Sequence, residues 1–297
     1  MKLNILLIMG LILSQFSFAG GKVSGLIRAN YAYDLENDKE TMDITRSYIT
    51  YKHTTEEGAV GRVTFDMVKN SNQNEERFNI FLKYAYFSFP VVPSTDVTIG
   101  LQLSLSYIEP YKMFGYAYLG YLPVVVNVAS DGSSVSDMGL TFKTKVSDQI
   151  TVKAGVLKGY GYKKLGKDED LLYATNVGYS EGNIKATLYG SIKPFHSNDT
   201  INNAQITVAP FVGYKTDQFR AGITAAMVSN QGGDDGDKGQ KTAVGVFGAY
   251  TLSEQLEAFG RFKTGKSDAD DDATNTIFGG VQYSPVKKMK LALKYGI

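Results

Sequence analysis

The 297-residue sequence contains no cysteine and only two histidines. The absence of cysteine excludes a disulfide framework and any thiolate chemistry. Beyond residue 19 there is no run of about 18 apolar residues, so no transmembrane helix is expected there. No sign of charge dominates either, since 31 lysines and arginines face 30 aspartates and glutamates. This balance gives no electrostatic indication of a nucleic-acid partner.

The first 19 residues have the organisation of a secretory signal peptide. Lys2 provides a positive start, residues 5–13 form a short apolar run, and Ser17-Phe18-Ala19 is a small-x-small cleavage site. We therefore expect a mature chain from Gly20 to Ile297, folded as one domain because no linker divides it. An exported chain without membrane helices is periplasmic, extracellular or a barrel in the outer membrane.

Apolar and polar residues alternate along nearly the whole mature chain. Val23, Ile27 and Tyr31 share one side of a segment that carries Arg28 on the other side. The same period of two recurs in more than ten further segments, with almost no helical period, and predicts an all-β fold. The facing of the segment from residue 42 to 53 stays ambiguous from its sequence.

Four of the alternating segments end in a tyrosine followed by a tight polar turn. The tyrosines are Tyr179, Tyr214, Tyr250 and Tyr283, at intervals of 35, 36 and 33 residues. A near-constant period of this size indicates one repeated supersecondary unit. Two strands of about ten residues with one tight turn and one longer loop describe a transmembrane β-hairpin, with the tyrosine at the bilayer interface.

Connections in the second half alternate between short and long. The short ones comprise residues 146–149 and the four turns after the tyrosines, and the long ones comprise residues 158–170, 194–203, 229–240 and 264–274. Short turns on one rim and long loops on the other are typical of bacterial outer-membrane barrels. The sequence thus predicts a transmembrane antiparallel β-barrel of 14–16 strands in the outer membrane, with short periplasmic turns and longer external loops.

Basic residues occur opposite the apolar rows, where they would face the inside of a barrel. Lipid-facing lysine or arginine would cost about 2–4 kcal/mol at the midplane, which favours the inward placement. The predicted pore-lining residues are Arg28, Arg62, Lys83, Lys143, Lys153, Lys185, Arg220 and Arg261. The acids expected on the same side are few, namely Asp66 and Glu257, so a preference for anions is predicted. The alternative is that these cations pair with nearby acids and only solvate the lumen.

Five short motifs, taken in order, resemble porins of Gram-negative bacteria, and most closely the phosphate-selective porin O and P family and its relatives. The motifs begin at Lys83-Tyr84-Ala85-Tyr86, Ile99-Gly100-Leu101-Gln102, Gly115-Tyr116-Ala117-Tyr118, Ser136-Asp137-Met138-Gly139 and Gly159-Tyr160-Gly161-Tyr162. Ala117 stands where an arginine commonly follows the Gly-Tyr pair, so the resemblance does not extend to phosphate selectivity.

The resemblance implies that residues 107–122 form a constriction loop folded into the barrel. Glu109, Tyr111, Lys112 and Tyr116 would then lie nearest the passage. The alternative is an ordinary external loop whose tyrosines pack on the rim. The expected partners are outer-membrane lipid, lipopolysaccharide and small, mainly anionic solutes, with a homotrimer as the expected assembly.

Catalytic and metal chemistry have little support in the sequence. His53 and His196 are expected on opposite rims, whereas a hydrolytic site of the usual kind needs a histidine beside an activated partner. The acidic clusters at 234–237 and 268–272 lack the spacing and terminal glutamate of calcium loops. We therefore expect no catalytic, cofactor or metal site, and a protein that is not an enzyme.

Two functions follow from this reading: a porin for passive diffusion of small hydrophilic solutes, with modest anion preference, or a closed barrel that serves as a structural element, adhesin or rim-site enzyme. The size of the side chains that face the inside of the barrel discriminates between the two functions. Small inward residues such as Gly100, Gly155 and Gly213 favour an open passage. Phe211 and Phe247 count against it.

Overall fold

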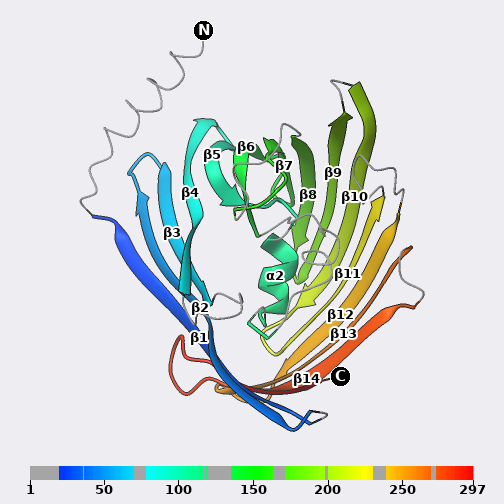
Figure 1. Cartoon of the computed structure of the whole chain (residues 1–297). Helices are drawn as coiled ribbons and strands as arrows, with labels where there is room; N and C mark the ends of the chain where they lie inside the picture. Colours follow the sequence, from blue (N-terminus) through cyan, green and yellow to red (C-terminus); the bar gives the residue numbers. More distant parts are fainter. Residues whose placement is uncertain are drawn as a thin grey trace. The chain divides into compact units, whose positions relative to one another are not determined.

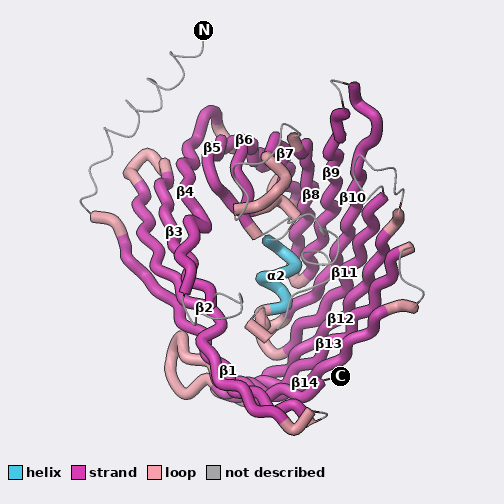
Figure 2. The backbone as a smooth tube through the Cα atoms, viewed as in Figure 1, coloured by secondary structure: helices cyan, strands magenta, loops and turns pink. Residues whose placement is uncertain are grey.

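The computed structural model describes residues 20–35, 37–69, 78–106, 108–116, 118–119, 135–162, 171–197, 200–229, 239–268 and 272–296. The predicted signal peptide lies outside these residues. The chain divides into two compact units, residues 1–87 and 88–297, which are taken separately below. Within the described ranges the chain is almost entirely strand, with fifteen strands and one short helix (Figures 1 and 2). None of the helical structure in those ranges is long and apolar enough to cross a membrane.

The first unit is an antiparallel sheet of sequential strands. It contains β1 (Lys22–Asp34), β2 (Lys39–Thr54), β3 (Val60–Lys69) and the first ten residues of β4 (Phe78–Val92). The register places Arg28 opposite Arg46, and Lys52 opposite Arg62. Residues directly opposite each other in such a ladder share a face. The register therefore settles the facing of residues 42–53, with Arg46 and Lys52 on the side of Arg28 and Arg62.

The second unit continues the same antiparallel order to the end of the chain. Its elements are the end of β4, β5 (Thr95–Leu103), α2 (Ile108–Phe114), β6 (Ser136–Lys145), β7 (Ile150–Leu157), β8 (Leu172–Glu181), β9 (Ile184–Ser197), β10 (Thr200–Lys215), β11 (Phe219–Ser229), β12 (Lys241–Thr251), β13 (Leu256–Ser267), β14 (Thr274–Tyr283) and β15 (Leu291–Gly296). Helix α2 lies on the concave face of this sheet (Figure 1), against β9, β10 and β11. We call this side of the second unit the inner face.

The opposite, outer face carries a continuous apolar row across five strands. Val212, Ile223, Val246, Phe262 and Ile277 stand opposite one another in register, and each is between 42% and 51% exposed. With about half of each of these apolar side chains exposed, no described element of the unit covers the row. Such a surface suits contact with lipid, in which an outward apolar band is the norm for a barrel.

Two of the predicted loops are wrong in extent. Strand β9 runs to Ser197 and β10 begins at Thr200, so residues 194–203 are mostly paired strand rather than loop. Strand β13 likewise reaches Ser267, within the predicted loop 264–274. The reason is that backbone pairing can continue where the apolar alternation ends, because polar side chains beyond the bilayer do not interrupt a ladder. The alternation also fails at the end of the chain, where the β14–β15 connection, residues 284–290, is longer than the β13–β14 connection, residues 268–273.

Candidate functional site

The segment that follows β5 turns back onto the inner face instead of remaining at the rim. We use "α2 segment" for its described residues, 104–106, 108–116 and 118–119. Tyr107 and residues 120–122 of the predicted constriction loop lie outside the described residues. The structure thus places Glu109, Tyr111, Lys112 and Tyr116 on a segment folded against the sheet.

Aromatic packing fixes the C-terminal half of the α2 segment. Met113, Phe114 and Tyr116 are at most 3% exposed. They form one cluster with inner-face phenylalanines of four strands, namely Phe211, Phe247, Phe259 and Phe278. The ring centroids of Phe114 and Phe247 are 5.3 Å apart, and those of Tyr116 and Phe259 are 4.2 Å apart. Each such pair contributes about 0.5–1.5 kcal/mol beyond its buried area.

Phe211 and Phe247 have a different role in the structure from the one that the sequence predicted. Phe211 and Phe247 were expected to count against an open passage because large inward side chains fill a lumen. In the structure they pack with Phe114 in one buried cluster. They therefore anchor an inward segment, a role that single-strand alternation does not distinguish from filling.

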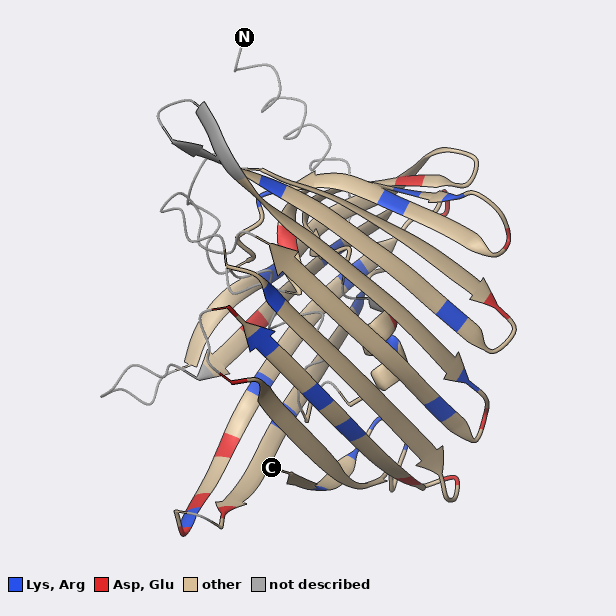
Figure 3. Ribbon diagram, turned by 90° about the vertical axis from the view of Figure 1, so that its right-hand side faces the viewer, with Lys and Arg blue, Asp and Glu red and all other residues tan. Residues whose placement is uncertain are grey.

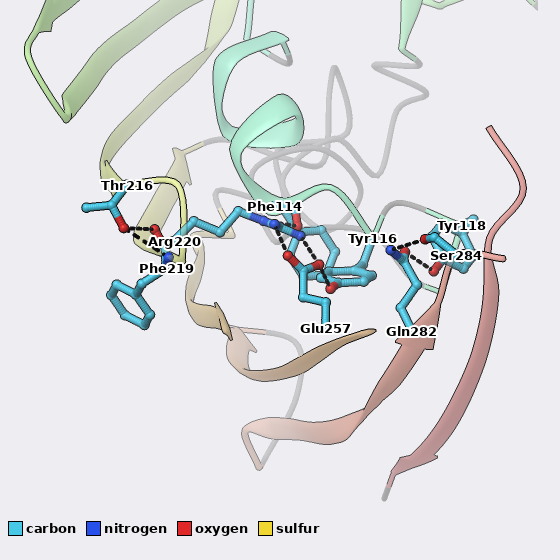
Figure 4. A network of polar contacts seen from close by, with 9 residues as sticks. All are labelled: Phe114, Tyr116, Tyr118, Thr216, Phe219, Arg220, Glu257, Gln282 and Ser284. Atoms are coloured by element: carbon cyan, nitrogen blue, oxygen red, sulfur yellow. Dashed lines mark hydrogen bonds and ion pairs between the residues drawn. The ribbon is translucent and has the colours of Figure 1, made fainter. Parts of the chain in front are cut away.

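A charged pair next to this cluster binds the same segment (Figure 4). Arg220 on β11 donates to both carboxylate oxygens of Glu257 on β13, at 2.5 Å to Oε2 and 2.7 Å to Oε1. The hydroxyl of Tyr116 donates a further hydrogen bond to Glu257 Oε1. A bidentate arginine–carboxylate pair is geometrically specific and strong. Glu257 thus joins the sheet to the α2 segment.

Two further polar contacts extend the attachment along the last strands. The Tyr118 hydroxyl donates to Gln282 Oε1 at 2.7 Å (Figure 4), and Lys294 Nζ donates to the backbone carbonyl of Leu119 at 3.4 Å. The side chain of Gln282 is itself buried. The end of the segment is therefore held by β13, β14 and β15 together.

The start of α2 makes weaker ion pairs than its end. Glu109 Oε2 lies 3.8 Å from Lys185 Nζ, and Glu109 Oε1 lies 3.3 Å from Lys112 Nζ. The Lys185 and Lys112 side chains are 45% and 68% exposed. Exposed pairs of this kind contribute about 0–1 kcal/mol. Apolar packing holds this part of the segment instead, since Leu105 is 4% exposed and lies with Tyr111 against the buried cluster of Leu157, Ala174 and Tyr189.

Two glycines make the close docking of α2 compatible with the sheet. Gly115 follows the last residue of the helix with φ of 75°, a left-handed conformation, and its N–H bonds the Tyr111 carbonyl at 3.1 Å. A Cβ at Gly213 on β10 would lie 3.0 Å from atoms of Met113. The first glycine turns the chain after the helix, and the second leaves room for the helix side chain.

A second group of charges lies in the first unit. Arg46 Nη1 is 2.6 Å from Asp66 Oδ2, and Lys83 Nζ is 3.6 Å from the same oxygen. Asp66 is fully buried, and Lys83 is 5% exposed. Lys83 Nζ also donates to the Tyr48 hydroxyl at 2.6 Å, and the Arg62 guanidinium stacks 4.2 Å from the Tyr84 ring centroid. Cations thus outnumber the single acid of this cluster.

The predicted pore-lining residues fall into two groups. Lys143, Lys153, Lys185, Arg220 and Arg261 share the inner face of the second unit, because ladder pairs connect them to the buried row of Asn176, Tyr189 and Phe278. Arg28, Arg62 and Lys83 belong to the cation-rich group of the first unit. Several are engaged rather than open to a solute: Arg220 with Glu257, Lys143 with Asp96 at 3.7 Å, and Arg261 with the Phe278 ring at 4.2 Å.

Figure 3 shows the distribution of charge over the strands of the second unit. Lysines and arginines occur within the strands, whereas most carboxylates lie near strand ends and turns. Glu257 was predicted as an inward acid and proves to be the one that holds Arg220. The sequence pattern placed Arg220 and Glu257 on the same side but did not identify their pairing, since β12 lies between their strands.

The described residues contain no group of three or more histidine, aspartate or glutamate side chains that could hold a metal ion. His53 lies near the end of β2 opposite Gly61, and His196 lies in β9 opposite Ile201. His196 is therefore part of a strand, where the sequence predicted an external loop.

No protein-family model matches the chain. No curated protein matches its sequence either. Solved structures do match over nearly the whole chain. The anion-selective porin from Comamonas acidovorans superposes with a TM-score of 0.71 and 13% sequence identity, covering 93% of this chain and 88% of that one.

Two further structures show the same fold. The outer-membrane channel DcaP of Acinetobacter baumannii has a TM-score of 0.64 and 13% identity over 94% of this chain and 91% of its own. The outer-membrane protein OmpT of Vibrio cholerae, in its trimer form, has a TM-score of 0.62 and 15% identity over 93% and 88%. The predicted fold class is confirmed: the chain has the antiparallel β-barrel fold of outer-membrane porins, with fifteen strands in its described residues.

Proposed function

We propose that the protein is a porin of the bacterial outer membrane, through which small hydrophilic solutes pass by diffusion. The observation that carries this proposal is the α2 segment, which is folded onto the inner face of a porin-type sheet and held there by the Arg220–Glu257 pair. An inward segment narrows a barrel without filling it. The short turns would face the periplasm and the longer loops the exterior, as in other bacterial barrels.

We further propose a modest preference for anions. It is supported by the inner-face lysines and by the first unit, where Arg28 stands opposite Arg46 and Lys52 opposite Arg62. Like charges directly opposite each other destabilise a sheet, and Asp66 neutralises only Arg46 of these four described residues by a close ion pair, so the cations of this face outnumber the acid that binds them. Since Arg220 is neutralised by Glu257, it contributes less than the sequence indicated. Phosphate selectivity is not part of the proposal, because Ala117 stands where an arginine commonly follows the Gly-Tyr pair.

The assembly that fits this proposal is a homotrimer in contact with lipid and lipopolysaccharide, and the trimer form of the OmpT structure supports the trimer. The second candidate function, a closed structural barrel, is favoured by the buried aromatic cluster around Phe114 and Phe247. The two functions differ in one measurable property, because only the porin conducts ions.

The test is planar-bilayer recording with the mature protein. We expect discrete conductance steps, and a higher single-channel conductance when residues 109–116 are deleted. Deletion of residues 231–238, eight residues in the β11–β12 connection, is the matched control and should leave conductance unchanged. If neither the mature protein nor the 109–116 deletion conducts, the closed barrel is supported. If the two have equal conductance, the α2 segment does not line the passage.

Location is tested independently. Fractionation should recover the mature chain, beginning near Gly20, in outer membranes, with a gel mobility that changes on boiling. Recovery as a soluble periplasmic protein without that change would contradict the proposed location.

A further inference from the structure

The outer face of the second unit contains a shallow apolar groove that the channel does not require. It has a volume of about 460 Å³ and crosses β6, β7, β8 and β9. Its floor is the register row formed by Ala154, Thr175 and Gly190, which are small residues directly opposite one another. Phe142 closes one end of this row, as the partner of Ala154.

Larger side chains raise the wall of the groove on the side of the long loops. Val156, Tyr173 and Ile192 form the next row in register, and Tyr173 and Ile192 are 48% and 42% exposed. The one side-chain polar atom of the floor is satisfied internally, since the Thr175 hydroxyl donates to the Lys153 carbonyl at 3.1 Å. The floor therefore offers methyl groups and backbone already paired in the ladder, so its occupant must be apolar.

A cation lies beyond this wall on the same face. Lys158 follows the end of β7, and its N–H donates to the Met138 carbonyl at 2.8 Å, which continues the β6–β7 ladder by one step. Lys158 thus alternates with Val156 and Ala154 along the outer face, and lies about 13 Å from the groove floor at about 3.3 Å per residue. An apolar groove with a cation at its rim side complements an acyl chain that bears an anionic headgroup.

The size of the groove argues against a second copy of the chain as the occupant. Ten residues line it, whereas a stable protein interface uses about 20–30 residues on each side. The projecting side chains of Phe142 and Tyr173 also make this area uneven, which suits a flexible chain better than a flat subunit contact.

We propose that this groove binds an acyl chain of lipopolysaccharide, with a lipid A phosphate near Lys158. The proposal rests on the outer-membrane location, with the long loops at the external leaflet, and not on channel activity. Contact of the acyl methylenes with the apolar floor and wall would favour the bound lipid over one that lies against a smooth outer face.

Native mass spectrometry with purified bisphosphorylated lipid A, added to protein in detergent, tests the proposal. Gly190→Leu fills the groove without a clash at its base, because a Cβ there would lie 3.8 Å from its nearest neighbour. Gly248→Leu is the matched control, since Gly248 is an outer-face glycine on β12 with a comparable space of 3.9 Å. Lys158→Glu tests the headgroup contact separately.

We expect one lipid A bound per protomer in the original protein and in Gly248→Leu, and at least fivefold weaker binding in Gly190→Leu and Lys158→Glu. Equal binding in all four proteins would overturn the proposal. A change of oligomeric state in Gly190→Leu, with lipid A binding unaltered, would also overturn it and make the groove a subunit contact. Single-channel conductance should be the same in all four, which separates this test from that of the channel.

Discussion

Arg220 and Glu257 are held face to face by two hydrogen bonds, although they lie 37 residues apart on strands that do not pair with each other. Their side chains are 16% and 14% exposed. Tyr116 reaches the same carboxylate from a third element, 141 residues away in sequence. Glu257 therefore connects the sheet to the α2 segment through Arg220 and Tyr116.

Glu257→Gln should loosen the α2 segment and raise single-channel conductance. The glutamine amide is uncharged and has one acceptor oxygen, so it cannot accept both hydrogen bonds from Arg220. The guanidinium of Arg220 is then left without its counter-ion. Removing one partner of a fully buried pair costs about 3–5 kcal/mol, and the cost here should be smaller because both side chains are partly exposed. Bilayer recording measures the conductance, and the temperature of the gel-mobility change measures stability. Glu254→Gln, in the exposed β12–β13 turn, should change neither quantity; an unaltered conductance in Glu257→Gln would mean that the pair does not position the segment.

Phe114→Ala should destabilise the protein more than it changes selectivity. Phe114 is 1% exposed and packs between Tyr116, Phe247 and Phe278. Its removal leaves a cavity in the cluster, at a cost of about 3–5 kcal/mol. Denaturant-dependent unfolding in detergent checks this value. Phe262→Ala, which removes an exposed ring of the outer face, should cost less in detergent, and a reversed order would contradict the docking of α2.

Gly115→Ala should be destabilising because φ at this position is 75° and a Cβ would lie 3.0 Å from the Arg220 guanidinium. The left-handed conformation costs about 1–2 kcal/mol for a residue with a Cβ. The same substitution at Gly248, which has an ordinary φ and more space, is the control and should be neutral or slightly stabilising. Thermal unfolding followed by gel mobility compares the two variants; equal stability would contradict the turn after α2.

Arg28→Glu should reduce anion preference without loss of stability. Arg28 stands opposite Arg46, so the substitution replaces a like-charge pair by an opposite-charge pair, worth about 0.2–1 kcal/mol. Reversal potentials under a KCl gradient should move toward cation selectivity at low salt and converge at high salt, where the Debye length falls to about 3 Å. Lys287→Glu, in the exposed β14–β15 turn, is the control. A cation-selective reversal potential in the unmodified protein would refute the proposed preference itself.

Much of the fold was predictable because each strand makes a local, periodic signal. Alternation identified the strands, and the tyrosines at 179, 214, 250 and 283 correctly marked the strand ends before short turns. The ends of β9 and β10 were not predictable in this way. The paired ends of these strands, residues 195–197 and 200–203, are mostly polar, and backbone pairing leaves no trace in the hydropathy pattern.

The site was predictable only in part. The motif around Gly115 located the inward segment, and parity assigned Arg220 and Arg261 to the inner face. Which cations would be neutralised could not be read from the chain, because the Arg220–Glu257 and Arg46–Asp66 pairs depend on how strands meet in three dimensions. The same holds for Phe211 and Phe247, whose role depends on Phe114 reaching them.

The attachments of the α2 segment also set an order of assembly. Every strand pairs with its neighbour in sequence, so the sheet forms through short-range contacts that close quickly. The bonds of Tyr116, Tyr118 and Leu119 instead span 141, 164 and 175 residues, and all of their partners lie on β13, β14 and β15. Tyr116, Tyr118 and Leu119 therefore dock last, whereas the helix itself contacts the earlier strands β9, β10 and β11. In a folding chain the end of the α2 segment stays undocked until the final hairpins have formed. An assembly interrupted before that point would leave a sheet with a wider interior, to which this end of the segment is not bound.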